Sequence, residues 1–312
     1  MASMVSRQQR AKGETFMAEA EKELKKSTWF SSSTEQKYEN AAELLEKAAN
    51  AFKVGGCGDE AGSAYARASD LYRDKLKNMG QASKCLSNAG ACYKKDNPTE
   101  AIASYRSAIT LLCDNGRLTQ AAKLSKEVAE LFEQEIDSNE TVTLAIESYE
   151  QAAELFEMER AKSQASTCKA KVAELLSAAM DPPDLIRAAE IYEDLGKQCL
   201  DNNLLKYNAK GYFLQAILCH LGNGDSIAAT QATQRYEAWD YTFGDSREGK
   251  FGNSLIECVE KFDSEGFATA CFEFDRITKL DPWKTSILVK VKRSVEGSGD
   301  DGLGDDDDVD LT

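Results

Sequence analysis

Basic residues gather in three stretches of the sequence, residues 82–95, 117–132 and 160–176. Together these stretches hold ten lysines and arginines and three acidic residues. The stretches that alternate with them hold six basic and eleven acidic residues. They are residues 61–75, 98–112, 141–158 and 184–199. Lysines and arginines grouped in this way attract an acidic partner and hold it through many weak contacts, so we expect an extended acidic ligand.

The residues that usually carry catalysis do not form a recognisable group. The chain has one histidine, His220, on an apolar helix face, and it contains no G-x-S-x-G, Walker or G-x-G-x-x-G motif. No His, Cys, Asp and Glu residues have metal-ligand spacing, and the nine cysteines are scattered without a C-x-x-C pair. Buried free thiols in a reducing compartment explain the cysteines better than disulfides or zinc. The sequence thus predicts a protein that is not an enzyme and has no metal or cofactor.

A repeated apolar pattern indicates which elements position the basic residues. Ala145, Tyr149, Ala152 and Phe156 occupy one face of a helix with 3.6 residues per turn. The same frame begins at nine positions, 19 to 24 residues apart. These positions are Ala41, Ala61, Ala82, Ala101, Ala121, Ala145, Ala165, Ala188 and Ala209. One helix and one turn fill such an interval, and two intervals make a helical hairpin of about 40 residues.

A single hairpin with a seam of small residues cannot bury its own apolar face, so the hairpins are expected to stack. The predicted fold class is all-α, a TPR-like helical-hairpin solenoid with a C-terminal helical bundle. The frame degenerates after Gly224, where further amphipathic helices precede a tail too polar to fold alone. The predicted domains are a helical-repeat solenoid over 1–224, a helical bundle over 225–296 and an acidic flexible tail over 297–312.

The overall charge and the distribution of apolar residues limit the partners. The formal net charge is −15, and the last sixteen residues contain seven aspartates and no basic residue. This balance disfavours nucleic acid as a partner and allows a positively charged partner for the tail. No apolar run approaches the ~18 residues of a membrane span, and the N-terminal residues lack an apolar signal core. We therefore expect a cytoplasmic protein.

Trp29 and Phe30 stand side by side in a polar loop that follows a lysine-rich helix end. One interpretation is that a ring of this pair packs between neighbouring helices. The other is that the pair is exposed and touches a membrane surface or a partner. The residues alone favour neither.

Several segments resemble the soluble NSF attachment protein family. They are Tyr93–Lys95 with Pro98, Gly116–Arg117 with Ala121–Lys123, Leu204–Phe213, Ala216–His220, Asp245–Glu248 and Phe274–Trp283. The resemblance covers nearly the whole chain from about residue 15 and ends in an acidic tail with a penultimate leucine. It is greatest to the alpha type of the family, and the gamma type is a rival.

This resemblance implies an adaptor. Proteins of the family bind the SNARE four-helix bundle, an acidic rod, through a basic wall. They recruit and stimulate the hexameric ATPase NSF, which disassembles the SNARE complex in vesicle fusion and membrane trafficking. The residues similar to the family's SNARE-binding lysines and arginines are Lys94, Lys95, Arg117, Lys123, Lys171, Lys206, Lys210 and Arg247. Thr167 departs from the alpha type, which has a lysine at that position.

The resemblance also implies contacts at the two ends of the chain. Trp29 and Phe30 are similar to the family's membrane-touching pair, and Leu311 with Asp310 to its NSF-binding end. Such a protein associates peripherally with membranes. Two alternatives stay open: a tail that folds back on the lysines of the last helix, and a helical-repeat scaffold that binds a short peptide without NSF.

Overall fold

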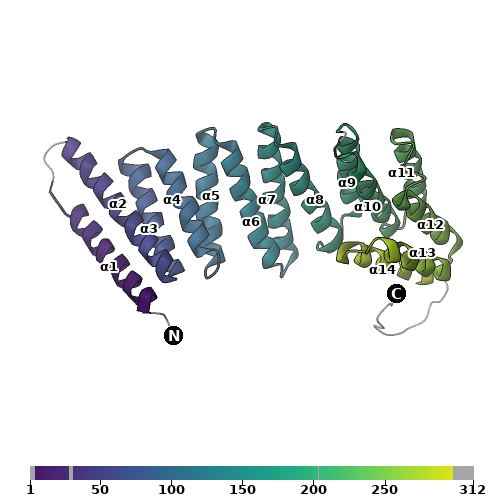
Figure 1. Ribbon diagram of the computed structural model, residues 1–312, viewed down its shortest axis with the longest axis horizontal. Coiled ribbons are helices and arrows are strands. Elements are labelled where there is room, and N and C mark those ends of the chain that lie inside the picture. Colours follow the sequence, from purple (N-terminus) through teal and green to yellow (C-terminus); the bar gives the residue numbers. More distant parts are fainter. Residues whose placement is uncertain (1–3, 28–30, 203, 298–312) are drawn as a thin grey trace. The chain divides into compact units, whose positions relative to one another are not determined.

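The computed structural model describes residues 4–27, 31–202 and 204–297 (Figure 1). The secondary structure of these residues is entirely helical, with fourteen α-helices, one π-helical turn and one 3-10 turn. The predicted all-α fold of helical hairpins is therefore confirmed. Trp29 and Phe30, like Asp310 and Leu311, lie outside the described residues.

Contacts between residues divide the chain into unit 1, Met1–Ala165, and unit 2, Ser166–Thr312. The helices of unit 1 are α1 (Met4–Leu24), α2 (Ser31–Gly55), α3 (Gly58–Asp70), η1 (Leu71–Lys75), α4 (Met79–Tyr93), α5 (Pro98–Asp114), α6 (Leu118–Gln134) and α7 (Asn139–Met158). The division falls within α8 (Lys162–Ala178). Unit 2 also contains α9 (Leu185–Leu200), η2 (Lys206–Asn208), α10 (Ala209–Gly222), α11 (Ser226–Trp239), α12 (Arg247–Lys261), α13 (Ser264–Ile277) and α14 (Pro282–Gly297). The domain bounds 1–224, 225–296 and 297–312 follow a change of sequence pattern rather than contacts, and they stay a prediction.

The repeated apolar frame forms the core of the stacked helices. All four frame positions are buried in six of the nine repeats, including Ala145, Tyr149, Ala152 and Phe156, which are at most 2% exposed. In each of the other three repeats one position is half-buried, and these positions are Phe132, Lys169 and His220. The frame was therefore a correct guide to which face of each helix is buried.

Rings from one helix fill the space above glycines of its neighbour. The pairs are Phe52 with Gly13, Tyr93 with Gly62, Tyr105 with Gly90 and Phe213 with Gly196. A Cβ atom at any of these glycines would lie 2.4 to 2.7 Å from the nearest ring atom, closer than real Cβ contacts. Each glycine thus lets an aromatic side chain of the next helix reach the backbone, which fixes how adjacent helices are aligned.

The ends of the helices follow local sequence signals. Asn97 accepts a hydrogen bond from the backbone N–H of Glu100, and Pro98 occupies the first helical position of α5. Asp225 caps α11 in the same way, through the N–H of Ala228 at 2.7 Å. Gly116, after α5, has a φ of 68°, a left-handed conformation that glycine adopts without a steric cost. Short turns of this kind keep successive helices antiparallel neighbours.

In unit 2, the last helix packs against helices that come much earlier in the chain. The indole Nε1–H of Trp283 on α14 donates a hydrogen bond to Ser177 Oγ on α8, at 2.8 Å. The same ring meets Tyr192 of α9 edge-on, with ring centroids 5.4 Å apart. Within this unit, the last helix therefore packs onto repeat helices α8 and α9. Among the described helices, none combines the length and apolar character needed to cross a bilayer.

Candidate binding surface for an acidic partner

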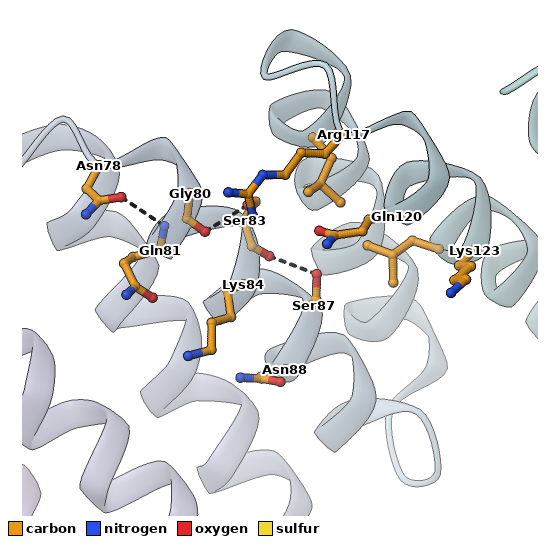
Figure 2. Close-up of a pocket in the computed structure, with 12 residues that line it drawn as sticks. Asn78, Gly80, Gln81, Ser83, Lys84, Ser87, Asn88, Arg117, Gln120 and Lys123 are labelled. Carbon is orange, nitrogen blue, oxygen red and sulfur yellow. Dashed lines mark hydrogen bonds between the residues drawn. The ribbon is translucent and has the colours of Figure 1, made fainter. Parts of the chain in front are cut away.

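A groove of about 600 Å³ lies between α4 and α6 in unit 1 (Figure 2). Lys84 from α4 and Arg117 and Lys123 from the α6 segment line it, together with polar side chains. The polar and remaining lining residues are Asn78, Gly80, Gln81, Ser83, Ser87, Asn88, Leu112, Gln120 and Leu124. None of these lining residues is acidic, so the groove presents three cations without a carboxylate among them. We call it the basic groove.

Helical spacing brings the cations of the basic groove together. Arg117 caps the N-terminus of α6, and Gln120 and Lys123 follow on the helix at intervals of three residues, so they project from neighbouring positions of one face. Arg117 starts the helix, and its Nη2 atom lies 3.9 Å from where a Cβ on Gly80 would be. The guanidinium group thus lies beside the first turn of α4, as Figure 2 shows. Two predicted SNARE-binding residues, Arg117 and Lys123, are therefore brought to one site.

The cations of the basic groove differ from other predicted site residues in their ionic partners. Within the described part of the chain, Lys84, Arg117 and Lys123 form no ion pair, and Lys95 is likewise exposed and unpaired. In contrast, the Nζ atom of Lys94 lies 2.5 Å from Glu127 Oε2 on α6. A paired lysine attracts a further carboxylate less strongly than a free one does. We therefore expect Arg117 and Lys123 to contribute more to binding of an acidic partner than Lys94.

The predicted site residues of unit 2 come from four elements. Lys171 on α8 pairs with Glu174 one turn later, at 3.1 Å, and Lys206 is exposed in η2. Lys210, at the start of α10, donates a hydrogen bond to the Thr242 carbonyl at 3.3 Å. The Nη1 atom of Arg247 donates to Thr278 Oγ1 at 2.8 Å. The hydrogen bonds of Lys210 and Arg247 hold both side chains against neighbouring segments of the unit.

Sequence reasoning missed some residues of this surface. Lys84 lies in a basic stretch, but resemblance did not single it out, and only the groove reveals its place beside Arg117. In unit 2, Leu204 and Tyr207 flank Lys206 and are 90% and 83% exposed, and Tyr241 is 88% exposed. Leu204 and Tyr207 lie between α9 and α10, and Tyr241 follows α11, where the apolar frame has already degenerated. Exposed rings beside lysines are typical of a surface that binds a protein partner.

The histidine and the cysteines have the environments of packing residues. Burial lowers the pKa of His220, and its Nε2 atom has no hydrogen-bond partner. Burial also raises the pKa of Cys85 and of Cys271 to about 12, so both remain thiols at neutral pH. Among the described residues, no group of three or more His, Cys, Asp or Glu side chains could hold a metal ion.

Stacked helical hairpins with an uncompensated basic groove define a helical-repeat binding protein. Comparison with known proteins gives the family. The profile of the family "Soluble NSF attachment protein, SNAP" matches residues 11–296. The alpha-soluble NSF attachment protein of Vitis vinifera is 40% identical over 285 residues, which cover 91% of this chain and 94% of that protein.

Relatives from animals and fungi agree with this assignment. The alpha-soluble NSF attachment protein of Homo sapiens is 36% identical over 294 residues, covering 93% of this chain and 97% of its own length. The vesicular-fusion protein SEC17 of Komagataella phaffii is 32% identical over 280 residues, covering 90% and 92% of the two chains. The chain belongs to the soluble NSF attachment protein family, and the resemblance seen in the sequence is confirmed.

Proposed function

We propose that this protein is an adaptor for vesicle fusion, which binds the SNARE four-helix bundle through its basic residues and recruits and stimulates NSF to disassemble it. The observation that carries the proposal is the basic groove, in which Lys84, Arg117 and Lys123 lie together without a carboxylate. Such a groove is unexpected by chance in a chain of net charge −15. The names of the relatives, which refer to NSF attachment and vesicular fusion, support the same function.

Binding in this proposal is electrostatic and spread over both units. Unpaired, exposed cations steer an acidic rod toward the protein, and each contributes a small part of the binding free energy. In unit 1 these are the cations of the basic groove and Lys95. In unit 2, Lys206 is such a cation, and the exposed rings of Tyr207 and Tyr241 add apolar contact. Lys210, which is half-buried, and Arg247, which pairs with Glu248 at 3.7 Å, also contribute. The paired lysines Lys94 and Lys171 exchange their present carboxylate partners for those of the SNARE bundle.

Two further parts of the adaptor lie outside the described residues. We propose that Trp29 and Phe30 touch the membrane on which the SNARE proteins are anchored, so that the protein works in the cytoplasm while peripherally bound to membranes. We propose that Leu311 and Asp310, in the acidic tail, are held by NSF. The protein itself performs no chemistry in this function, because the ATPase is NSF.

Reversing two charges of the basic groove tests the proposal. The variant Arg117→Glu with Lys123→Glu should bind a soluble SNARE bundle roughly thirtyfold more weakly, because each reversal costs about 1 kcal/mol of attraction. Titration followed by light scattering or calorimetry measures this. Wild-type binding should also weaken as salt rises and the Debye length falls to about 8 Å.

The matched control reverses Arg7 and Lys53, which are exposed and outside the basic groove. It changes the net charge by the same amount and should bind almost as well as the wild type. Melting of both variants should match the wild type, because exposed charges contribute little to folding. Equal losses in the two variants would show that only total charge matters and would refute a specific basic surface.

Leu311→Ala tests the adaptor half of the proposal. SNARE binding should be unchanged, because the proposal assigns Leu311 to NSF and the basic residues to the SNARE bundle, whereas NSF-driven disassembly should become at least several-fold slower. The measurement is ATPase activity and disassembly at matched levels of bound adaptor. If this variant and a deletion of residues 300–312 both support disassembly at the wild-type rate, the tail has no role in stimulating NSF.

A further inference from the structure

Unit 1 has a second groove, which the residues of the basic groove do not line. It consists of two adjoining hollows of about 750 and about 320 Å³ between α5 and α7, and Arg106 borders both. The N-terminal halves of the two helices line the larger hollow and the following turns line the smaller one. The lining runs from Thr99 to Thr110 on α5 and from Thr141 to Gln151 on α7. We call it the α5–α7 groove.

The larger hollow has an apolar floor. Its apolar lining residues are Ile102, Ala103, Phe132, Ile136 and Leu144. Ile136 is 39% exposed, and Phe132 is the frame position that the core of the repeat leaves half-buried. The guanidinium carbon of Arg106 lies 5.5 Å from the centroid of the Phe132 ring, so this cation rests on the floor. Apolar side chains held open in a concave surface favour burial against a partner.

The rim of the α5–α7 groove is acidic. Glu135, Asp137 and Glu147 line it, and Arg106 is the one basic residue among the lining side chains. Hydrogen bonds from Thr141 and Ser138 hold the pKa of Asp137 below its usual range, so its carboxylate is charged at neutral pH. The whole of α7 contains five glutamates and no basic residue. An acidic partner or an anionic lipid surface would be repelled here.

The dimensions of the groove fit a short helix. The groove extends along residues 99–110 of α5 and 141–151 of α7, and eleven residues of helix span about 16 Å, or three turns. An amphipathic helix buries side chains spaced three and four residues apart in such a groove. Lysines or arginines at its flanks would then face Glu135, Asp137 and Glu147, whereas the position over Arg106 suits a polar or acidic side chain.

We propose that the α5–α7 groove docks a short, basic, amphipathic helix of a partner protein. The partner is distinct from the acidic ligand of the basic groove, because the two grooves share no lining residue. Alternate helices of a hairpin stack lie on different walls, so unit 1 has room for both partners. The protein would then link an acidic partner to a basic one.

A synthetic helix tests the proposal with the full-length chain. The probe is a fluorescein-labelled peptide of leucine and lysine, about 14 residues and roughly four turns long, with leucines on one face. Fluorescence anisotropy should show saturable binding of this peptide by the wild type. The matching peptide of leucine and glutamate should not bind. If neither peptide binds, or both bind equally well, the proposal is wrong.

Variants locate the binding site. Ile136→Asp and Glu147→Lys each change an exposed side chain of the groove and should weaken peptide binding roughly tenfold, or about 1.4 kcal/mol. The controls Val54→Asp and Glu39→Lys make the same changes at exposed positions of α2 and should bind the peptide normally. Equal affinity in groove variants and controls would overturn the proposal.

Three further measurements separate the alternatives. Hydrogen exchange of the peptide complex should show protection within residues 99–110 and 132–151, and protection only elsewhere would contradict the assignment. Sedimentation should show that the wild type does not self-associate. Self-association that is lost in Ile136→Asp would instead mean that a second copy of the protein occupies the groove. SNARE binding by Ile136→Asp should equal that of the wild type, which keeps this test independent of the basic groove.

Discussion

Replacing Gly196 by alanine should lower the free energy of unfolding by about 2 kcal/mol. The new Cβ would lie 2.4 Å from Cε1 of Phe213, and that ring has no free space to move into. Phe213 is fully buried, stacks on Tyr236 with centroids 4.3 Å apart and meets Phe243 edge-on. Overpacking of this kind costs up to about 3 kcal/mol, and the better helix propensity of alanine offsets about 1 kcal/mol of it.

Gly211→Ala is the matched control for this substitution. Gly211 is also a helical glycine of unit 2, but no atom lies within 4 Å of where its Cβ would be. The control should therefore stabilise the protein by up to about 1 kcal/mol. Chemical unfolding followed by circular dichroism measures both. Adding Phe213→Leu should relieve part of the cost of Gly196→Ala, and strictly additive effects would mean that the two residues do not clash.

Trp283→Ala should have the largest effect on stability, a loss of about 3–5 kcal/mol. The side chain is 8% exposed, packs edge-on against Tyr192 and donates a hydrogen bond to Ser177 Oγ. Removing it leaves a cavity between α14 and the helices that α14 covers. Hydrogen exchange should show that the amides of α14 lose their protection before those of α9 and α10.

One further substitution separates the apolar contact of Trp283 from its hydrogen bond, and another serves as a control at an exposed ring. Trp283→Phe keeps most of the apolar contact and should cost about 1–2 kcal/mol, because Ser177 loses only its indole partner. Tyr241→Ala removes a large ring of the same unit that is 88% exposed, and it should change stability by less than about 0.5 kcal/mol. If Trp283→Ala is as mild as Tyr241→Ala, α14 does not contribute to the core of unit 2.

The helical repeat was predictable because its apolar spacing is present within the sequence of each single repeat. The spacing of apolar residues identified the buried face of each repeat, although one frame position is half-buried in three of the nine. Contacts between helices were not predictable, since they depend on the angle at which two helices pack. The ion pair of Lys94 with Glu127, which lie 33 residues apart, is an example.

The candidate site was predictable only in part for the same reason. Charge counting placed Lys84, Arg117 and Lys123 in basic stretches, and resemblance singled out Arg117 and Lys123. Only the packing of α4 against its neighbours brings Lys84 to the same groove. The hollow beside Phe132 also needed the structure, because the sequence pattern counted this ring as a core residue.

The pairing of rings with glycines also limits where the chain can gain or lose a residue. On α4, the backbone at Gly90 contacts the ring of Tyr105 from α5. Three residues later on the same helix, the ring of Tyr93 contacts the backbone at Gly62 of α3. One residue inserted or deleted before Gly90 would rotate this side of the helix by about 100° and displace both contacts at once. The turn at Gly116, where a Cβ would meet nothing within 4 Å, has no such restriction. Length changes should therefore be tolerated in the turns of this protein and rejected within its helices.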